Sequence, residues 1–183
     1  MKWRSRPEPG VQVSGKRTLN VRVQGESILP RGRNGLPALR NPVLEGAPNR
    51  AQCRQVIEEF RANAGRVGGN FERRPLLLLT TTGRKTGRTH TTPVAYLADG
   101  DGYCVFASKG GAPEHPAWYL DLVANPRVIV EAGTERFEAQ ATVVGPDERD
   151  ALYRKQVSLY SQFAAYERKT TRTILLVGLT RTN

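Results

Sequence analysis

The stretch that decides the fold is LLLLTTTGRKTGRTHTTPV, residues 76–94. It begins with an apolar run over residues 76–81 that has the length and the β-branched ending of a buried strand. A turn with two glycines around Arg84 and Lys85 follows, and a second run rich in Thr and Val covers residues 89–97. Two such runs joined by a short glycine-containing turn predict a β-hairpin with a basic tip.

The pattern continues after this hairpin. Residues 99–102, DGDG, form a second predicted turn, and residues 103–107 a third strand. The sequence Ser-Lys-Gly-Gly then follows at residues 108–111. Glycines let backbone N–H groups converge on an anion, and Arg or Lys adds positive charge. If the two basic loops lie on the same rim of the sheet, they face one anion together.

The basic tip over residues 83–87, GRKTG, is not a P-loop. That motif has a glycine directly before the lysine and another five residues before that glycine, where this chain has Arg84 and Leu79. An ordinary hairpin tip with solvated cations is the alternative to phosphate binding. The loop at 108–111 strengthens the anion-binding hypothesis, although Ser108 in it lacks the G-x-S-x-G context of a nucleophilic serine.

The rest of the chain adds helices and a second hairpin. Helical patterns cover residues 50–64, 116–124 and 146 to about 160. Strand patterns cover residues 128–132, 135–144 and 174–179. In the second of these strands Phe137, Ala139, Ala141 and Val143 alternate inward. Because strands and helices do not alternate regularly, we expect an α+β, mainly β fold of about six antiparallel strands curled into a small barrel with flanking helices.

The first 48 residues differ in composition from the rest. They hold nine Lys or Arg against three Glu, with six prolines, six glycines and a single aromatic residue, Trp3. Low hydrophobicity and high charge are typical of disorder. We expect residues 1–48 to be a disordered basic tail or translated sequence upstream of the true start, and residues 49–183 to form the folded domain. An arm that contacts nucleic acid or anionic lipid is the alternative.

The chain of 183 residues carries a formal net charge of +11 at pH 7, which favours a phosphate-bearing partner or an anionic surface. Cys53 and Cys104 are its only cysteines, and no apolar run approaches the roughly eighteen residues of a membrane span. These features predict a cytoplasmic protein, with peripheral membrane contact through the basic tail as an alternative. His90 and His115, the only histidines, lack metal-ligand spacing, so no metal site is expected.

Two groups of aromatic residues accompany the basic loops. Trp118 and Tyr119 lie in the predicted helix over 116–124, where they either pack in the core or wall a planar ligand. Tyr160, Phe163 and Tyr166 are spaced by three and form an aromatic face late in the chain. Packing onto the sheet is the simpler explanation of that face.

Three motifs together carry a family resemblance: LLLLTTTGRKTGR at 76–88, FASKGGAP at 106–113 and HPAWYLDLVANP at 115–126. From about residue 49 to 180 the chain resembles the deazaflavin-dependent nitroreductase family of flavin-reductase-like split β-barrels. The resemblance implies a split β-barrel with an FMN-binding-like fold that binds 8-hydroxy-5-deazaflavin (coenzyme F-420). It implies an oxidoreductase that passes a hydride from this coenzyme to a small quinone-like or nitroaromatic acceptor.

The resemblance also implies which residues form the site. The coenzyme would contact Arg84, Lys85, Thr86, Thr91, Thr92, Pro93, Phe106, Ala107, Ser108, Lys109, Trp118 and Tyr119. The acceptor pocket would be shaped by Tyr160, Phe163 and Tyr166, and the residues expected to take part in catalysis are Tyr160, Tyr166 and Ser108.

Two positions depart from the family pattern. His90 stands where arginine is common, which weakens one contact to the coenzyme tail or leaves it to Arg88. Phe163 stands where the nitroreducing members carry a tyrosine, which favours quinones or another acceptor over nitro compounds. A coenzyme carrier without turnover is the competing hypothesis. A nucleic-acid-binding protein is disfavoured, because the aromatic residues are not interleaved with the cations.

Overall fold

The computed structural model describes residues 49–72 and 74–182. All of these residues belong to one compact unit of the chain. The proposed tail, residues 1–48, lies outside the described residues. Its disorder, its contacts with membrane or nucleic acid, and the domain boundary at Asn49 therefore stay predictions.

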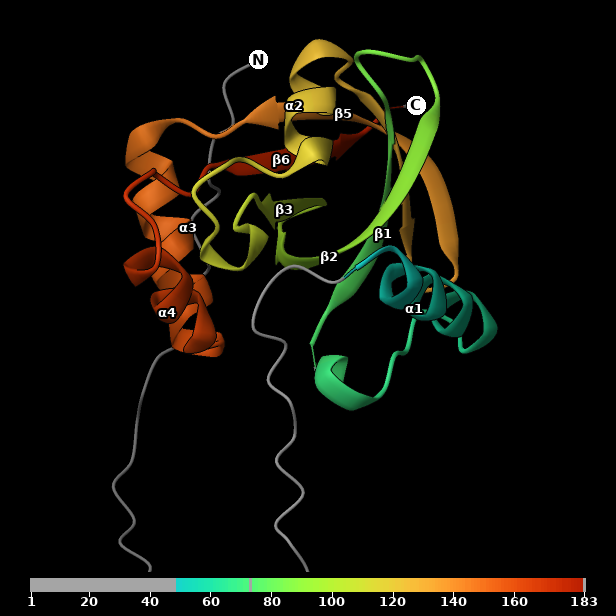
Figure 1. Ribbon diagram of the computed structural model, residues 1–183, viewed down its shortest axis with the longest axis horizontal. Helices are drawn as coiled ribbons and strands as arrows, with labels where there is room; N and C mark the ends of the chain where they lie inside the picture. Colours follow the sequence, from blue (N-terminus) through green and yellow to red (C-terminus); the bar gives the residue numbers. More distant parts are fainter. Residues whose placement is uncertain (1–48, 73, 183) are drawn as a thin grey trace, which may run out of the picture. The chain divides into compact units, whose positions relative to one another are not determined.

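Six strands form a closed barrel in the order β1-β2-β3-β6-β5-β4 (Figure 1). All six neighbouring pairs are antiparallel. The expected antiparallel barrel is confirmed. The strands are β1 Leu76–Thr82, β2 Thr89–Asp99, β3 Gly102–Phe106, β4 Arg127–Ala132, β5 Glu135–Val143 and β6 Leu176–Arg181.

Four helices surround this barrel, with α1 on one side, α3 and α4 together on another, and α2 over one end (Figure 1). They are α1 Arg50–Ala62, α2 Ala117–Ala124, α3 Pro146–Leu159 and α4 Gln162–Arg168, with short 3-10 turns at Gly69–Phe71 and Lys109–Gly111. Three separate core clusters result: the barrel interior, the layer under α1 and the layer under α3 and α4.

The leucine run of β1 is buried on both of its faces. Leu77 and Leu79 belong to the cluster inside the barrel, whereas Leu76 and Leu78 belong to the cluster under α1. Side chains alternate between the two faces of a strand, so a strand covered on both faces must be apolar throughout. This explains the absence of polar alternation in the run.

Helix α1 begins where the sequence predicts and ends earlier. Asn49 and Gln52 form a reciprocal capping box, each side chain accepting the backbone N–H of the other. The helix was expected to reach Ala64 but ends at Ala62, because Ala64 and Gly65 adopt positive φ angles of 52° and 87°. A Cβ at Gly65 would lie 2.5 Å from the backbone of the β4–β5 turn, so this close approach requires glycine.

The layer under α3 and α4 corrects the predicted start of the last strand. Ile174 is fully buried there but precedes β6, which begins at Leu176. Its carbonyl accepts a hydrogen bond from Arg149 Nε at 3.0 Å. The cluster comprises Leu97, Cys104, Phe106, Tyr153, Phe163, Ile174 and Leu176.

Strand β5 shows the predicted alternation except at its end. Ala139 and Ala141 are buried, and Phe137 is half-buried. Val143 was expected to point into the core but is 43% exposed. It pairs with the buried Val177 and is the last residue of its strand, so it lies at the edge of the barrel.

Candidate active site

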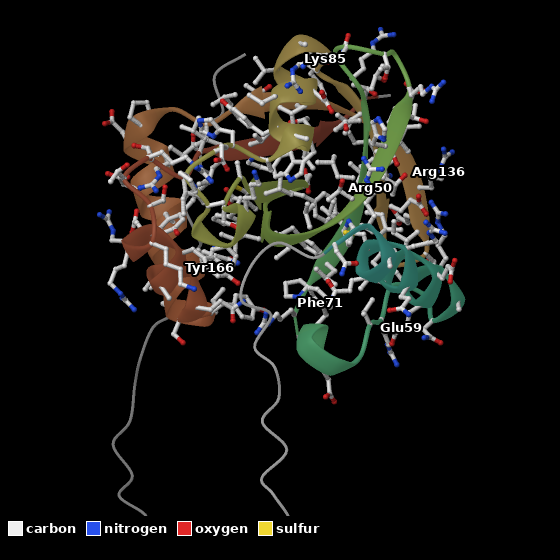
Figure 2. The ribbon with its side chains drawn as sticks, viewed as in Figure 1. Arg50, Glu59, Phe71, Lys85, Arg136 and Tyr166 are labelled. Atoms are coloured by element: carbon white, nitrogen blue, oxygen red, sulfur yellow. The ribbon has the colours of Figure 1, made fainter. Side chains whose placement is uncertain are left out.

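The tip loop, residues 83–88, joins β1 to β2 and presents cations to solvent. Its turn is closed by hydrogen bonds from the Gly83 N–H to the Arg88 carbonyl and from the Gly87 N–H to the Gly83 carbonyl, both 2.8 Å. Gly87 has a φ of 67°, the left-handed region that favours glycine. Lys85 is exposed and lies beside α2 at the top of the view in Figure 2.

Helix α2 holds the tip loop through two polar residues that the sequence analysis did not single out. Asp121 Oδ1 accepts from Arg84 twice, from the guanidinium Nη1 at 2.8 Å and from the backbone N–H at 3.1 Å. Asn125 Nδ2 donates to the carbonyl of Thr82 at 3.2 Å. Arg84, predicted to contact the coenzyme tail, is thus an anchor of the loop, whereas the exposed Lys85 remains directed to solvent.

The second cationic loop, the Ser108 loop (residues 108–111), has an unusual backbone. Ser108 is right-handed, whereas Lys109, Gly110 and Gly111 all have positive φ angles of 48°, 64° and 83°. A right-handed residue followed by a left-handed one turns successive N–H groups to one side, which makes a concavity for an anion. Among the described residues, the N–H groups of Lys109 and Gly110 donate to no backbone carbonyl outside this turn.

The charge of Lys109 is partly compensated at the surface. Its Nζ lies 3.2 Å from Glu114 Oε2, and Glu114 is largely exposed. The hydrogen bond from Lys109 lowers the pKa of the Glu114 carboxyl. An exposed pair of this kind is weak, so Lys109 is available to a stronger anion.

Arg172, in the turn between α4 and β6, binds the Ser108 loop from behind. Its Nη2 donates to the carbonyls of Ala107 at 3.0 Å and Ser108 at 2.9 Å, and its Nε donates to the carbonyl of Ala112 at 3.0 Å. Burial lowers the pKa of this guanidinium. The sequence offers no local signal for the role, because all three acceptors lie at least 60 residues away.

His115 lies between this arginine and α2. Its Nδ1 is 3.4 Å from Arg172 Nη1, and its ring centroid is 5.0 Å from that of Tyr119. Arginine carries only donors, so Nδ1 is the acceptor and the proton of the neutral ring is on Nε2. Burial, with a smaller contribution from Arg172, lowers the pKa of His115.

The tip loop contacts α2 at Asp121, whereas the Ser108 loop is bound by Arg172, which lies against His115 just before α2 begins. In β2, Thr89 at the tip loop is six residues before Ala95, which pairs with Leu76 at the start of β1. The next residue, Tyr96, pairs with Val105 of β3, which runs antiparallel to β2 and so back toward the tip loop. An extension of this register brings Ser108 level with Pro93, four residues or about 13 Å from Thr89. The eight residues of α2 span about 12 Å. The arrangement suits an elongated anionic molecule.

The predicted coenzyme contacts on β2 do not share one face. Thr91 pairs with Thr80, and their hydroxyls are 2.8 Å apart. Thr92 pairs with Leu79, whose side chain is inside the barrel. Since side chains alternate, Thr91 and Pro93 lie on the outer face and Thr92 on the inner face. One ligand on one face therefore meets only part of this set through side chains.

The predicted aromatic contacts are core residues. Trp118 and Tyr119, each 8% exposed, belong to the cluster inside the barrel. Phe106 is buried under α3 and α4, and Ala107 is fully buried. Any planar ligand therefore meets the edges of these residues or requires them to move.

The three late aromatic residues differ in their burial. Phe163 is 4% exposed, and its ring lies 5.3 Å from Phe106 and 5.4 Å from Tyr166, between ring centroids. Tyr160 and Tyr166 are only partly buried, and Figure 2 shows Tyr166 on α4, on the side of the protein away from Lys85.

Helix α4 packs directly on the Ser108 loop. A Cβ built on Gly111 would lie 2.6 Å from the Tyr166 carbonyl oxygen and 2.8 Å from the Lys169 Cβ. The structure thus brings the backbone of the predicted acceptor residue Tyr166 against the loop predicted to hold the coenzyme. The hydrogen bonds of the described residues do not join the side chains of Tyr160, Tyr166 and Ser108 to one another.

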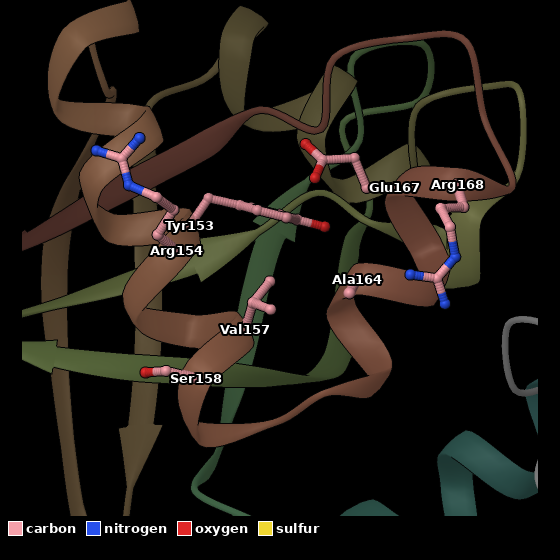
Figure 3. Close-up of a pocket in the computed structure, with 7 residues that line it drawn as sticks. All are labelled: Tyr153, Arg154, Val157, Ser158, Ala164, Glu167 and Arg168. Carbon is pink, nitrogen blue, oxygen red and sulfur yellow. The ribbon is translucent and has the colours of Figure 1, made fainter.

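A groove of about 450 Å³ lies elsewhere, between α3 and α4 (Figure 3). It contains none of the residues expected to bind coenzyme or acceptor, so it does not mark the predicted site. It is lined by Tyr153, Arg154, Val157, Ser158, Ala164, Glu167 and Arg168.

Within residues 49–72 and 74–182, no three His, Cys, Asp or Glu side chains gather in a group able to hold a metal ion. In the same residues no helix has the length and apolar character required to cross a membrane.

The fold and the two loops together define a class of protein, namely a split β-barrel with cationic loops suited to an elongated anionic coenzyme. Residues 52–181 match the family described as F420H(2)-dependent quinone reductase. The chain belongs to this family of deazaflavin-dependent oxidoreductases. The predicted family resemblance, the enzyme class and the 8-hydroxy-5-deazaflavin coenzyme are confirmed.

Individual relatives support the same assignment. An F420H(2)-dependent quinone reductase of Mycobacterium tuberculosis is 40% identical over 126 residues, which are 67% of this chain and 85% of that protein. A solved F420-H2 dependent reductase, FDR-A, is 36% identical with a TM-score of 0.53, covering 58% of this chain and 94% of that one. Another solved structure, described as a domain-swapped dimer, is 33% identical with a TM-score of 0.55, covering 69% of this chain and 92% of that one.

Proposed function

We propose that this protein reduces a quinone-like acceptor with a hydride from reduced deazaflavin, binding the anionic tail of the coenzyme at the tip loop and its ring system beside the Ser108 loop. The observation that carries the proposal is the placement of two cationic loops toward opposite ends of α2, one held by Asp121 and the other by Arg172 through partly buried hydrogen bonds. A coenzyme with a planar ring and a long anionic tail matches that separation.

The residues present fit such a group. Lys85 is exposed at the tip, and the Lys109 and Gly110 N–H groups converge in the Ser108 loop. A cation or N–H group that donates to an anionic oxygen makes a charge-assisted hydrogen bond, which is stronger than a neutral one. These contacts would bind and orient the coenzyme, while α4 and its Tyr166 cover the Ser108 loop from the other side.

When bound, the reduced deazaflavin supplies the hydride. A quinone that accepts a hydride also needs one proton to become a hydroquinone, and the second oxygen receives it. The partly buried hydroxyls of Tyr160 and Tyr166, or water, are the proposed proton donors. Ser108, whose carbonyl is bound by Arg172, would orient the ring through its backbone and hydroxyl.

The acceptor is proposed to be a quinone and not a nitro compound. Phe163 is buried against Phe106 and Tyr166 and brings no hydroxyl to the site. A quinone needs one hydride, which the reduced deazaflavin would supply, and one proton, which the hydroxyls of Tyr160 and Tyr166 or water would supply.

Fluorescence titration with deazaflavin and with FMN tests the proposal. Deazaflavin should bind more tightly, and its affinity should fall as salt rises. Lys85→Ala should weaken binding by roughly 1.5–3 kcal/mol, or about 10- to 150-fold, if Lys85 donates to the tail. Lys155→Ala, at an exposed lysine of α3, is the matched control and should change nothing. Equal affinity for FMN would refute the assignment, and binding without reduction of menadione would identify a carrier.

A further inference from the structure

We propose that Arg172 is a positioning residue that holds the Ser108 loop in its anion-binding conformation without touching the coenzyme. The inference rests on the proposed function, because the anion in question is the bound deazaflavin. It adds a residue from a different part of the chain to the coenzyme site.

All three side-chain nitrogen atoms of Arg172 contact other groups of the protein. Nη2 donates to the carbonyls of Ala107 and Ser108, Nε donates to the carbonyl of Ala112, and Nη1 lies 3.4 Å from His115 Nδ1. These acceptors enclose the Ser108 loop from both of its ends. A planar guanidinium can reach several acceptors in fixed directions, which the point charge of a lysine cannot do.

The contact with the Ser108 carbonyl sets the direction of the next N–H group. In a trans peptide the C=O and N–H groups point to opposite sides. The Ser108 carbonyl points at Arg172, so the Lys109 N–H points away from it, toward the side where an anion can bind. Arg172 therefore determines which way the concavity of the loop faces.

The loop needs such support because its backbone is strained. Lys109 has a positive φ of 48°, which an L-residue with a Cβ rarely adopts. Strained residues persist where the surroundings over-determine them, and they gather at ligand sites. Here the surroundings are Arg172 on one side and α4 at Gly111 on the other.

Arg149 offers a matched control. It is also a largely buried arginine that donates to a backbone carbonyl, that of Ile174, and pairs with Asp150 and Glu167. These bonds connect α3 to α4 and to the segment before β6, and none of the three partners belongs to the Ser108 loop. Loss of general stability should therefore appear in both arginine variants, and loss of loop geometry only at Arg172.

The experiment compares Arg172→Lys, Arg172→Ala and Arg149→Lys. Arg172→Lys, which keeps the charge, should raise the Kd for deazaflavin and its KM at least tenfold, with kcat at saturating coenzyme within threefold. In the ligand-free protein, hydrogen-exchange protection of the Gly111 and Ala112 amides should fall at least tenfold, because these amides donate to the Ser108 and Lys109 carbonyls. Arg149→Lys should do neither.

Unchanged amide protection and an unchanged Kd in a folded Arg172→Lys would overturn the inference. An equal effect of Arg149→Lys would also overturn it, because the role would then be general stability. If Arg172→Ala does not fold, Arg172→Lys decides alone. Absence of deazaflavin binding in the parent protein would instead refute the proposed function, and the affinity part of this inference with it, whatever the exchange data show.

Discussion

The ion pair between Asp121 and Arg84 gives the sharpest test of how α2 holds the tip loop. Replacing Asp121 by Asn removes the charge from an almost identical side chain. Both hydrogen bonds from Arg84 go to Oδ1, and an asparagine oxygen can still accept them, so the substitution chiefly removes the negative charge that faces the guanidinium. We expect the barrel to remain folded and the tip loop to loosen.

The size of the effect follows from the burial of the two partners. Asp121 is 6% exposed, while the Arg84 side chain is 34% exposed. A hydrogen bond to a charged group contributes about 1.5–3 kcal/mol, and a fully exposed ion pair about 0–1 kcal/mol. The pair lies between these cases, so Asp121→Asn should lower the free energy of unfolding by about 1–2 kcal/mol. For a domain of this size that is a fall in Tm of roughly 3–10 °C.

A double-mutant cycle in urea isolates the interaction. Asp121→Asn, Arg84→Gln and the double variant should show a coupling free energy of about 1–2 kcal/mol. Arg88→Gln, at another exposed cation of the tip, is the control and should change stability by less than about 0.5 kcal/mol. Strict additivity of Asp121→Asn and Arg84→Gln would refute the anchoring role of the pair.

Three further outcomes are expected. Burial lowers the pKa of His115 in the folded protein, so the unfolded chain binds that proton first as pH falls. The stability from this group is present above about pH 6.5 and is lost below it. Lowering the pH from 7.5 to 5 should therefore lower the free energy of unfolding of the parent more than that of His115→Gln, as measured by urea denaturation. Phe163→Tyr should raise nitroaromatic reduction and leave menadione reduction within a fewfold, at a stability cost of about 1–3 kcal/mol if its buried hydroxyl finds no partner; unchanged nitro turnover would contradict it. Gly111→Ala should lower both Tm and deazaflavin affinity, because its Cβ would meet the α4 backbone, whereas Gly145→Ala, in open space, should not affect binding.

Most of the barrel could be predicted from local signals. The run at Leu76–Thr82, the glycine turns and the alternation of β5 each act within a few residues, and each specifies a strand or a hairpin. The errors lie at ends of elements, as at Ala64 and Val143, where packing against distant segments decides the backbone or the burial. The family motifs supplied the split barrel and the coenzyme class.

The contacts that hold the site could not be predicted in this way. Asp121 lies 37 residues from Arg84, and Arg172 lies 60 or more residues from the carbonyls that it binds. The sequence does contain one indication of the role of Asp121, because it is an acidic residue inside the apolar helix sequence AWYLDLVA. The sequence contains no such indication for Arg172, because its acceptors are mainly backbone carbonyls, which every sequence contains.

Helix α2 contacts the tip loop directly and is linked to the Ser108 loop through His115 and Arg172, and this has a thermodynamic consequence. Asp121 near its C-terminal end binds the tip loop, while His115, just before its N-terminal end, lies against Arg172 behind the Ser108 loop. If the proposed coenzyme contacts both loops, fixing the helix through one loop would lower the entropy left to lose at the other, so we expect the two halves of the ligand to bind with positive cooperativity. By the same linkage, coenzyme fragments that carry the ring or the tail alone should each strengthen the binding of the other.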